Sequence, residues 1–162
     1  MARRWSKLQK AIYNLVAKDL PLQVHVTEMP EALETGSLNL LGMFWVTLAK
    51  EIIWHFPKDF VTHWTEWPDG SNQYSYSVAD INRVVREYID TPLDELLTKQ
   101  FSHDYCAISD VLKASDRRLA PHRLAHHFKN TKSEAVRKIL DHRLSSNHRL
   151  QPTPRRRAAQ RG

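Results

Sequence analysis

The sequence predicts an α+β domain, in which an antiparallel sheet of three to five strands is covered by an N-terminal helix and a C-terminal helical layer. Three observations favour this class. Residues 4–18 repeat apolar side chains at spacings of three and four, as an amphipathic helix does. The strand candidates, rich in β-branched and aromatic residues, all lie between residues 22 and 77. From Ser77 onward the helical spacing returns, so strands and helices occupy separate stretches of the chain.

The length of 162 residues fits one domain, which we place at residues 1–145, followed by a disordered basic tail at residues 146–162. This tail contains two prolines, several arginines and no acidic residue. No run of about 18 apolar residues predicts a membrane helix, and no apolar stretch follows the basic start, as a signal peptide requires. Cys106 is the single cysteine, which excludes an intramolecular disulfide, and we expect a cytoplasmic protein.

The first predicted elements are a helix and a strand. The helix at residues 4–18 carries an apolar stripe and ends before Pro21, and we expect the stripe to pack on the sheet. Residues 22–27 alternate apolar and polar side chains, which predicts a strand with one buried face. Residues 29–42 are rich in Glu, Leu and Gly, and we expect them to form a long loop.

Residues 43–60 form the densest apolar and aromatic stretch and predict the central hairpin of the sheet. A two-residue turn at Ala49-Lys50 would place Trp45 opposite Trp54, although Ala-Lys is not the Asn-Gly chemistry that such a turn prefers. In this register the side chains divide into two faces: Phe44, Val46, Leu48 and Ile53 on one, and Trp45, Thr47, Ile52, Trp54 and Phe56 on the other. Because both faces are apolar, we expect both to be covered. A longer turn would exchange the two faces.

A second hairpin and a run of helices complete the predicted fold. Residues 60–67 and 73–77 flank a Pro-Asp-Gly turn and predict the second hairpin. Helices are then expected from Ser77, from Thr91-Pro92 with Leu93, Leu96 and Leu97 inward, over residues 105–119, from Pro121, and over residues 133–144.

Four segments of the chain resemble a small family of uncharacterised bacterial proteins. They are residues 5–10 (W-S-K-L-Q-K), 45–54 (W-V-T-L-A-K-E-I-I-W) with 57–60 (P-K-D-F), 86–92 (R-E-Y-I-D-T-P) and 113–119 (K-A-S-D-R-R-L). The likeness runs from about residue 4 to about residue 144, with one departure at His55, where the family pattern has Asp. The resemblance implies a bacterial cytosolic protein and supplies no activity.

Positive charge is concentrated in the C-terminal part of the chain. Residues 1–100 contain 10 Lys or Arg against 13 Asp or Glu, whereas residues 101–162 contain 14 against 5. This asymmetry predicts that nucleic acid or an acidic protein surface binds to the second half. The candidate contact residues are Arg117, Arg118, His122, Arg123, Lys129, Arg137 and Lys138. The alternative is a solvated basic surface in which neighbouring acidic residues pair with some of these side chains.

Other side chains suggest chemistry more weakly. His122 and His126 are one helical turn apart and could share a metal ion, with Asp116 or His103 as a third ligand, but the Glu of a metalloprotease motif is missing. The alternative is a pair of solvated histidines. Cys106 is expected to be a buried structural thiol rather than a nucleophile. The four glycines are scattered and form no phosphate-binding loop, so we expect no cofactor.

Three function classes follow from these observations. The first is a non-enzymatic binding protein that contacts nucleic acid or an acidic protein surface through its basic half. The second is an immunity-type or other protein-interaction module that uses the aromatic residues of the strand region, which are more often core residues. The third is a metal-dependent hydrolase or nuclease. We expect a protein that is not an enzyme and does not associate with a membrane.

Overall fold

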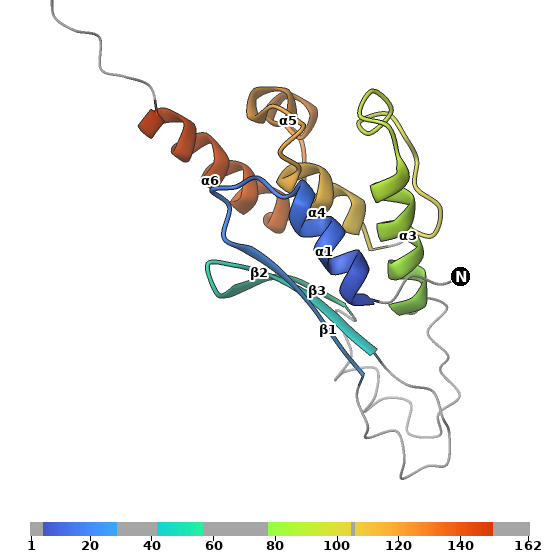
Figure 1. Ribbon diagram of the computed structural model, residues 1–162. Coiled ribbons are helices and arrows are strands. Elements are labelled where there is room, and N and C mark those ends of the chain that lie inside the picture. The colour runs from blue at the N-terminus through green and yellow to red at the C-terminus, as the bar shows by residue number, and fades with distance from the viewer. Residues whose placement is uncertain (1–4, 29–41, 57–77, 105, 151–162) are drawn as a thin grey trace, which may run out of the picture.

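The protein is a two-layer α+β structure, as the sequence predicts. The computed structural model describes residues 5–28, 42–56, 78–104 and 106–150. Figure 1 shows the helices gathered on one face of a three-stranded antiparallel sheet of order β1-β2-β3. In chain order the elements are α1 (Trp5–Leu15), β1 (Leu22–Glu28), β2 (Gly42–Leu48), β3 (Glu51–Phe56), α3 (Val78–Asp90), α4 (Ile108–Ser115), α5 (Pro121–His127) and α6 (Glu134–Leu150).

The β2–β3 hairpin has the predicted two-residue turn. Leu48 pairs with Glu51, and both turn residues have a positive φ, 48° at Ala49 and 71° at Lys50. This is the pattern of a type I′ turn, whose twist matches that of the two strands. The amide of Ala49 donates to the carbonyl of Pro21 at 3.0 Å, which fixes the turn against the start of β1. Hydrogen bonding and strand twist therefore select a left-handed backbone at two residues that do not favour it.

The predicted register of the hairpin is wrong beyond its first two pairs. Thr47 pairs with Ile52 but Val46 pairs with Trp54, so Ile53 is an extra residue that forms a β-bulge. The bulge places Trp54 on the same side as Phe44, and their rings meet edge to face with centroids 5.8 Å apart. The indole of Trp54 also donates to the carbonyl of Cys106 at 3.2 Å. The aromatic residues of β3 therefore face the helices rather than Trp45.

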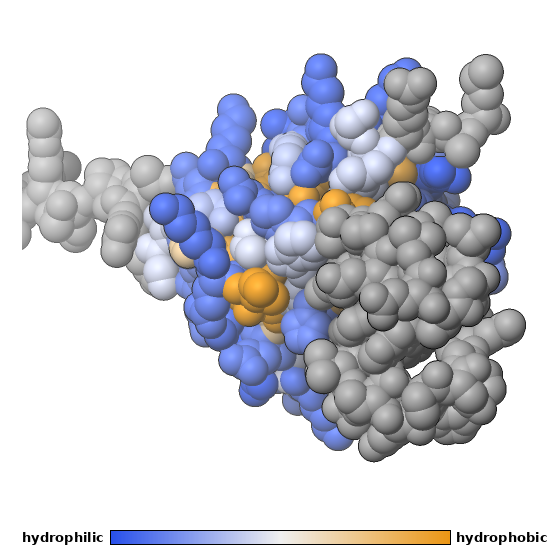
Figure 2. Space-filling view, turned by 90° about the horizontal axis from the view of Figure 1, so that it is seen from below, coloured by the Kyte–Doolittle hydropathy of each residue, from blue (hydrophilic) through white to orange (hydrophobic). Residues whose placement is uncertain are grey.

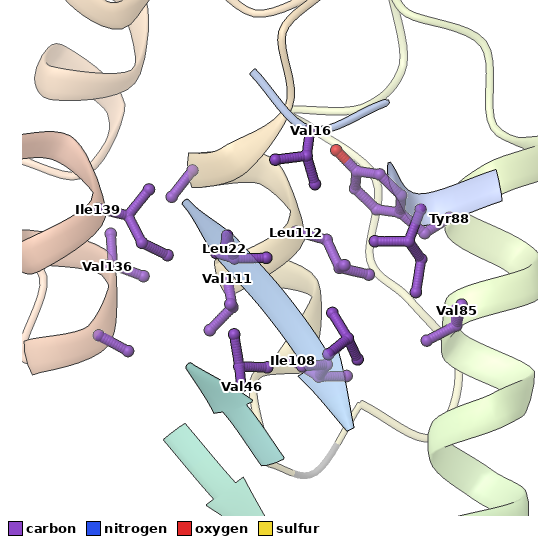
Figure 3. Packing of buried hydrophobic residues seen from close by; sticks show 14 of the residues in the cluster. Val16, Leu22, Val46, Val85, Tyr88, Ile108, Val111, Leu112, Val136 and Ile139 are labelled. Carbon is purple, nitrogen blue, oxygen red and sulfur yellow. The ribbon is translucent and has the colours of Figure 1, made fainter. Parts of the chain in front are cut away.

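Helix α4 lies at the centre of the hydrophobic core. Seven of its eight residues are buried, because α3, α5 and α6 all pack around it. Figure 3 shows Ile108, Val111 and Leu112 of this helix lying between side chains of the sheet and of α3 and α6. All three side chains are buried, and the helix is shorter than the predicted span of residues 105–119.

Two boundaries differ from the prediction. Residues 91–98 form successive turns rather than a helix, and Leu93 is exposed while Leu96 is fully buried. Helix α6 continues to Leu150, so the first part of the predicted tail is helical. The remainder of that tail, the second predicted hairpin and nearly all of the predicted loop at residues 29–42 lie outside the described residues.

Candidate nucleic-acid interface

Helix α5 is a short helix held to the protein by two apolar side chains. Pro121 occupies its first turn after an extended Ala120, an arrangement that starts a helix without a missing hydrogen bond. Leu124 is fully buried, and so is most of Phe128, the residue after the helix. The amide of Phe128 donates to the carbonyl of Leu124 at 2.8 Å. Leu124 and Phe128 therefore anchor the helix to the core, and the remaining residues form its outer surface.

We use the name basic segment for residues 117–133, which contain α5 and the turns on either side. This segment has five Lys or Arg and three His but no Asp or Glu. The exposed side chains of Arg117, Arg123, Lys129 and Lys132 form no ion pair with the part of the chain that the structure describes. Uncompensated cations on a fixed backbone produce a positive potential that attracts polyanions.

Arg118 differs from the other cations of the basic segment because its guanidinium pairs with Asp116. The Arg118 Nη2 lies 2.7 Å from Asp116 Oδ2, and the Arg118 amide donates to the same carboxylate at 2.9 Å. Tyr88 donates its hydroxyl to Asp116 Oδ2 at 2.7 Å. Burial, followed by the charge of Asp116, raises the pKa of Tyr88, and the hydrogen bond with Asp116 raises the pKa of Arg118. Arg118 thus carries a compensated charge.

Arg143 of α6 has a structural role, because it binds backbone carbonyls inside the protein. Its buried guanidinium donates to the carbonyls of Ala114 at 2.8 Å, Asp116 at 3.1 Å and Leu119 at 2.8 Å. These carbonyls belong to the end of α4 and the turn that follows, where a helix leaves acceptors without partners. Burial lowers the pKa of Arg143, and the nearby charge of Asp116 opposes this effect. The side chain therefore joins α6 to the C-terminus of α4.

The two remaining candidate cations lie on α6 and differ in their surroundings. Lys138 contacts Glu51, the first residue of β3, and lies 3.3 Å from Glu134. Its charge is shared between these two carboxylates, and it connects α6 to the hairpin. Arg137 is exposed and forms no ion pair in the described regions.

His127 lies where α5 meets α4. Burial lowers the pKa of His127, the charge of Lys113 lowers it further, and Asp110 raises it. Lys113 itself is buried, with its Nζ 3.8 Å from Asp110 Oδ1 and 5.4 Å from the centre of the Phe101 ring. The pKa of Asp110 is raised, mainly by burial. This side of α5 is therefore partly enclosed, in contrast to the side that carries Arg123.

The proposed metal ligands His122 and His126 are both exposed on α5. Within residues 5–28, 42–56, 78–104 and 106–150, no three His, Cys, Asp or Glu side chains are grouped so that they could hold a metal ion. Asp116, suggested as a third ligand, has its carboxylate occupied by Tyr88 and Arg118. The metal site thus stays a prediction that rests on two histidines alone.

The structure divides the predicted contact residues into two groups. His122, Arg123 and Lys129 lie together on α5 and the turn after it, with Arg117 in the turn before it. Like these residues, Arg137 on α6 is exposed, whereas Arg118 and Lys138 are in intramolecular ion pairs. Sequence reasoning did not single out Lys18, which lies with Arg117 beside an open hollow at the end of α1. The absence of acidic residues from the whole basic segment is the sequence signal that marks this surface.

No helix in the described regions combines the length and apolar character needed to cross a membrane. Comparisons of the chain with protein-family models, with curated proteins and with solved structures found no match.

Proposed function

We propose that the protein is a non-enzymatic binding protein whose basic segment contacts the phosphates of nucleic acid. One observation carries the proposal: four exposed cations of this segment, Arg117, Arg123, Lys129 and Lys132, have no carboxylate partner in the described regions. Cations of this kind neutralise phosphates without reading the base sequence. The proposal places the protein in the bacterial cytoplasm, as the family resemblance implies.

The anchoring of α5 supports this function. Leu124 and Phe128 hold the helix to the core, so the backbone that carries the cations does not need to be ordered when a polyanion binds. Arg143 and Asp116 fix the turn that leads into α5 from the other side. The ordered backbone of the basic segment therefore reduces the entropic cost of binding.

The test is the binding of the full chain to fluorescent DNA and RNA, as duplex and as single strands, between about 50 mM and about 300 mM KCl. With about four phosphates neutralised, the logarithm of the affinity should fall with the logarithm of the salt concentration with a slope of about −4 for duplex DNA and about −3 for single strands. The double variant R123A/K129A should weaken binding and reduce this slope by about two.

A matched control removes the same charge elsewhere. Lys7 and Lys10 are exposed on α1. The K7A/K10A variant should therefore bind with nearly the same affinity and salt slope as the unchanged protein. Absence of binding at the lowest salt concentration, or equal weakening by both double variants, would contradict the proposal. Binding to polyglutamate but not to nucleic acid would point to an acidic protein surface instead.

A protein-interaction module is the second candidate, and the helix-free face of the sheet favours it. Among the described elements, the helices lie on one face only (Figure 1). The opposite face, seen in Figure 2, has a compact apolar spot among polar residues. Ile52 is 57% exposed, and next to its partner Thr47 the rings of His25 and Trp45 stack with centroids 5.0 Å apart.

This second candidate predicts that a partner protein binds to the helix-free face of the sheet. Capture of one protein from the native cytosol after nuclease treatment should be lost in I52K and retained in L93K, because Leu93 is an exposed apolar residue away from the sheet. If both variants capture the same proteins as the unchanged chain, the sheet face is not the interface.

A further inference from the structure

An open hollow lies at the C-terminal end of α1, outside the residues that carry the proposed function except for Arg117. It is lined by Tyr13, Asn14, Val16, Ala17, Lys18, Leu20, Leu22 and Arg117. Its apolar part is made by core residues, since Val16, Leu20 and Leu22 are all buried. Its outer part carries two cations and an exposed aromatic side chain. A cation, an aromatic ring and an apolar floor are the elements with which proteins hold a nucleotide.

The ring of Tyr13 is exposed but its position is fixed. The side chain is 40% exposed, whereas its hydroxyl accepts from the Val24 amide at 3.1 Å and donates to the Val24 carbonyl at 3.4 Å. Gln9 supports both groups, because its Nε2 lies 3.3 Å from the Tyr13 hydroxyl and 2.7 Å from the Val24 carbonyl. Since the hydroxyl is held at the edge of β1, the ring presents a surface that does not have to be ordered when a ligand stacks on it.

Among the residues that the structure describes, no carboxylate pairs with the two cations of the hollow. Lys18 and Arg117 are exposed and form no ion pair in the described regions. Asp19 follows Lys18 directly but does not line the hollow. The hollow therefore combines positive charge with an aromatic surface and contains no acidic side chain.

The backbone on the two sides of the hollow is joined. The amide of Arg117 donates to the carbonyl of Leu15 at 2.7 Å, and the amide of Ala17 donates to the carbonyl of Ser115 at 2.8 Å. Between these bonds Val16 and Asp116 form an isolated antiparallel bridge. The end of α1 and the start of the basic segment thus move as one unit, which keeps Tyr13, Lys18 and Arg117 on a shared frame.

We propose that this hollow is a subsite for one unpaired nucleotide, whose base stacks on Tyr13 and whose phosphate is held by Lys18 and Arg117. The inference rests on the proposed nucleic-acid function and adds a preference for single strands to it. A base inside a duplex is stacked on both sides and cannot reach a protein ring, whereas an unpaired base can. Arg117 belongs to both surfaces, so a strand bound along the basic segment would reach the hollow without a break.

The test compares short oligo(dT) and oligo(U) with a duplex of the same length, using the full chain at several salt concentrations between about 50 mM and about 300 mM KCl. The Y13L variant should bind the single strands about tenfold more weakly, which is within the usual effect of one stacked base. It should bind the duplex as the unchanged protein does. The K18A variant should reduce the salt slope for single strands by about one.

A conservative variant separates stacking from support of the fold. Y13F keeps the ring and loses the hydroxyl bonds to β1, so it should retain most of the affinity for single strands. If Y13F is as weak as Y13L, the hydroxyl bonds rather than stacking are responsible and the subsite is refuted. Unchanged binding in Y13L together with weakening in R123A/K129A would refute the subsite and leave the proposed function intact. Absence of binding by the unchanged chain would refute both.

Discussion

Helices α4 and α5 follow one another in the chain and use charged residues in opposite ways. Seven of the eight residues of α4 are buried. At its end, Arg118 donates to the carboxylate of Asp116, and Arg143 donates to the carbonyl of the same residue. In α5 only Leu124 is buried, and Arg123 forms no ion pair in the described regions. Both regions lie within residues 101–162, where the positive charge of the sequence is concentrated. Burial, rather than charge count, therefore separates cations that stabilise the fold from cations that can meet a ligand.

The largest expected effect comes from breaking the buried network at the end of α4. Asp116 is 1% exposed and accepts hydrogen bonds from Tyr88 and from the Arg118 amide and guanidinium. Asp116→Ala would leave these donors without an acceptor and should lower the free energy of unfolding by about 3 kcal/mol. Urea unfolding followed by Trp fluorescence measures this change.

Asp116→Asn is the matched control, because it keeps the shape and one acceptor oxygen for Tyr88. It should lower the free energy of unfolding about half as much as Asp116→Ala does. The guanidinium of Arg118 is partly solvated, so the loss of its charged partner destabilises the protein less than it would at a fully buried cation. If Asp116→Ala unfolds within about 0.5 kcal/mol of the unchanged protein, which is the range of ordinary surface substitutions, the network does not hold the fold.

A comparison of two arginines on α6 gives a smaller effect. Arg143→Met removes three hydrogen bonds to the carbonyls of Ala114, Asp116 and Leu119 and should destabilise the protein by about 2 kcal/mol. Arg137→Met, on the exposed side of the same helix, should change the stability by less than about 0.5 kcal/mol.

Nucleic-acid binding should respond to the two α6 substitutions in the opposite order. Arg137→Met should weaken it slightly, whereas Arg143→Met should leave it unchanged at temperatures where the protein is folded. Equal loss of stability in the two variants would mean that burial does not separate the two kinds of cation.

The sequence predicts the fold where one periodic pattern dominates a segment. The apolar stripe of α1 and the alternation in β1 are both confirmed, because each element has one face toward the core. The bulge at Ile53 could not be predicted, because one extra residue in a strand is decided by where Trp54 packs rather than by the pattern itself. The turns at residues 91–98 also replace a predicted helix, and there Leu96 is buried whereas Leu93 is exposed.

The candidate interface is predictable to a lesser extent. The lack of acidic residues around α5 is visible in the sequence, and it marks Arg123 and Lys129 as available cations. The pairing of Lys138 with Glu51 is not visible, because the two residues are 87 positions apart and meet only when α6 packs near the hairpin. The hollow at the end of α1 was also hidden, since Lys18 and Arg117 are brought together by the bridge between Val16 and Asp116.

The smallest expected effect concerns His127, which lies between the two regions. Burial and the charge of Lys113 hold its pKa below the ordinary value of 6.5, so the folded state binds fewer protons than the unfolded state just below that pH. The contribution of His127 to stability is therefore present above about pH 6.5 and is lost as the pH falls. The loss should stay below about 0.5 kcal/mol, because solvent screens a largely exposed ring.

The charged neighbours of His127 supply a test with opposite signs. NMR titration of the imidazole should give a raised pKa in Lys113→Met, where a repelling charge is removed, and a further lowered pKa in Asp110→Asn, where an attracting charge is removed. An unchanged pKa in both variants would mean that burial alone sets the pKa of His127. Opposite shifts would show that two charged residues of α4 control the pKa of His127, although His127 belongs to α5. The imidazole would then behave as part of the enclosed region around α4, whereas Arg123, one turn earlier in α5, belongs to the exposed surface.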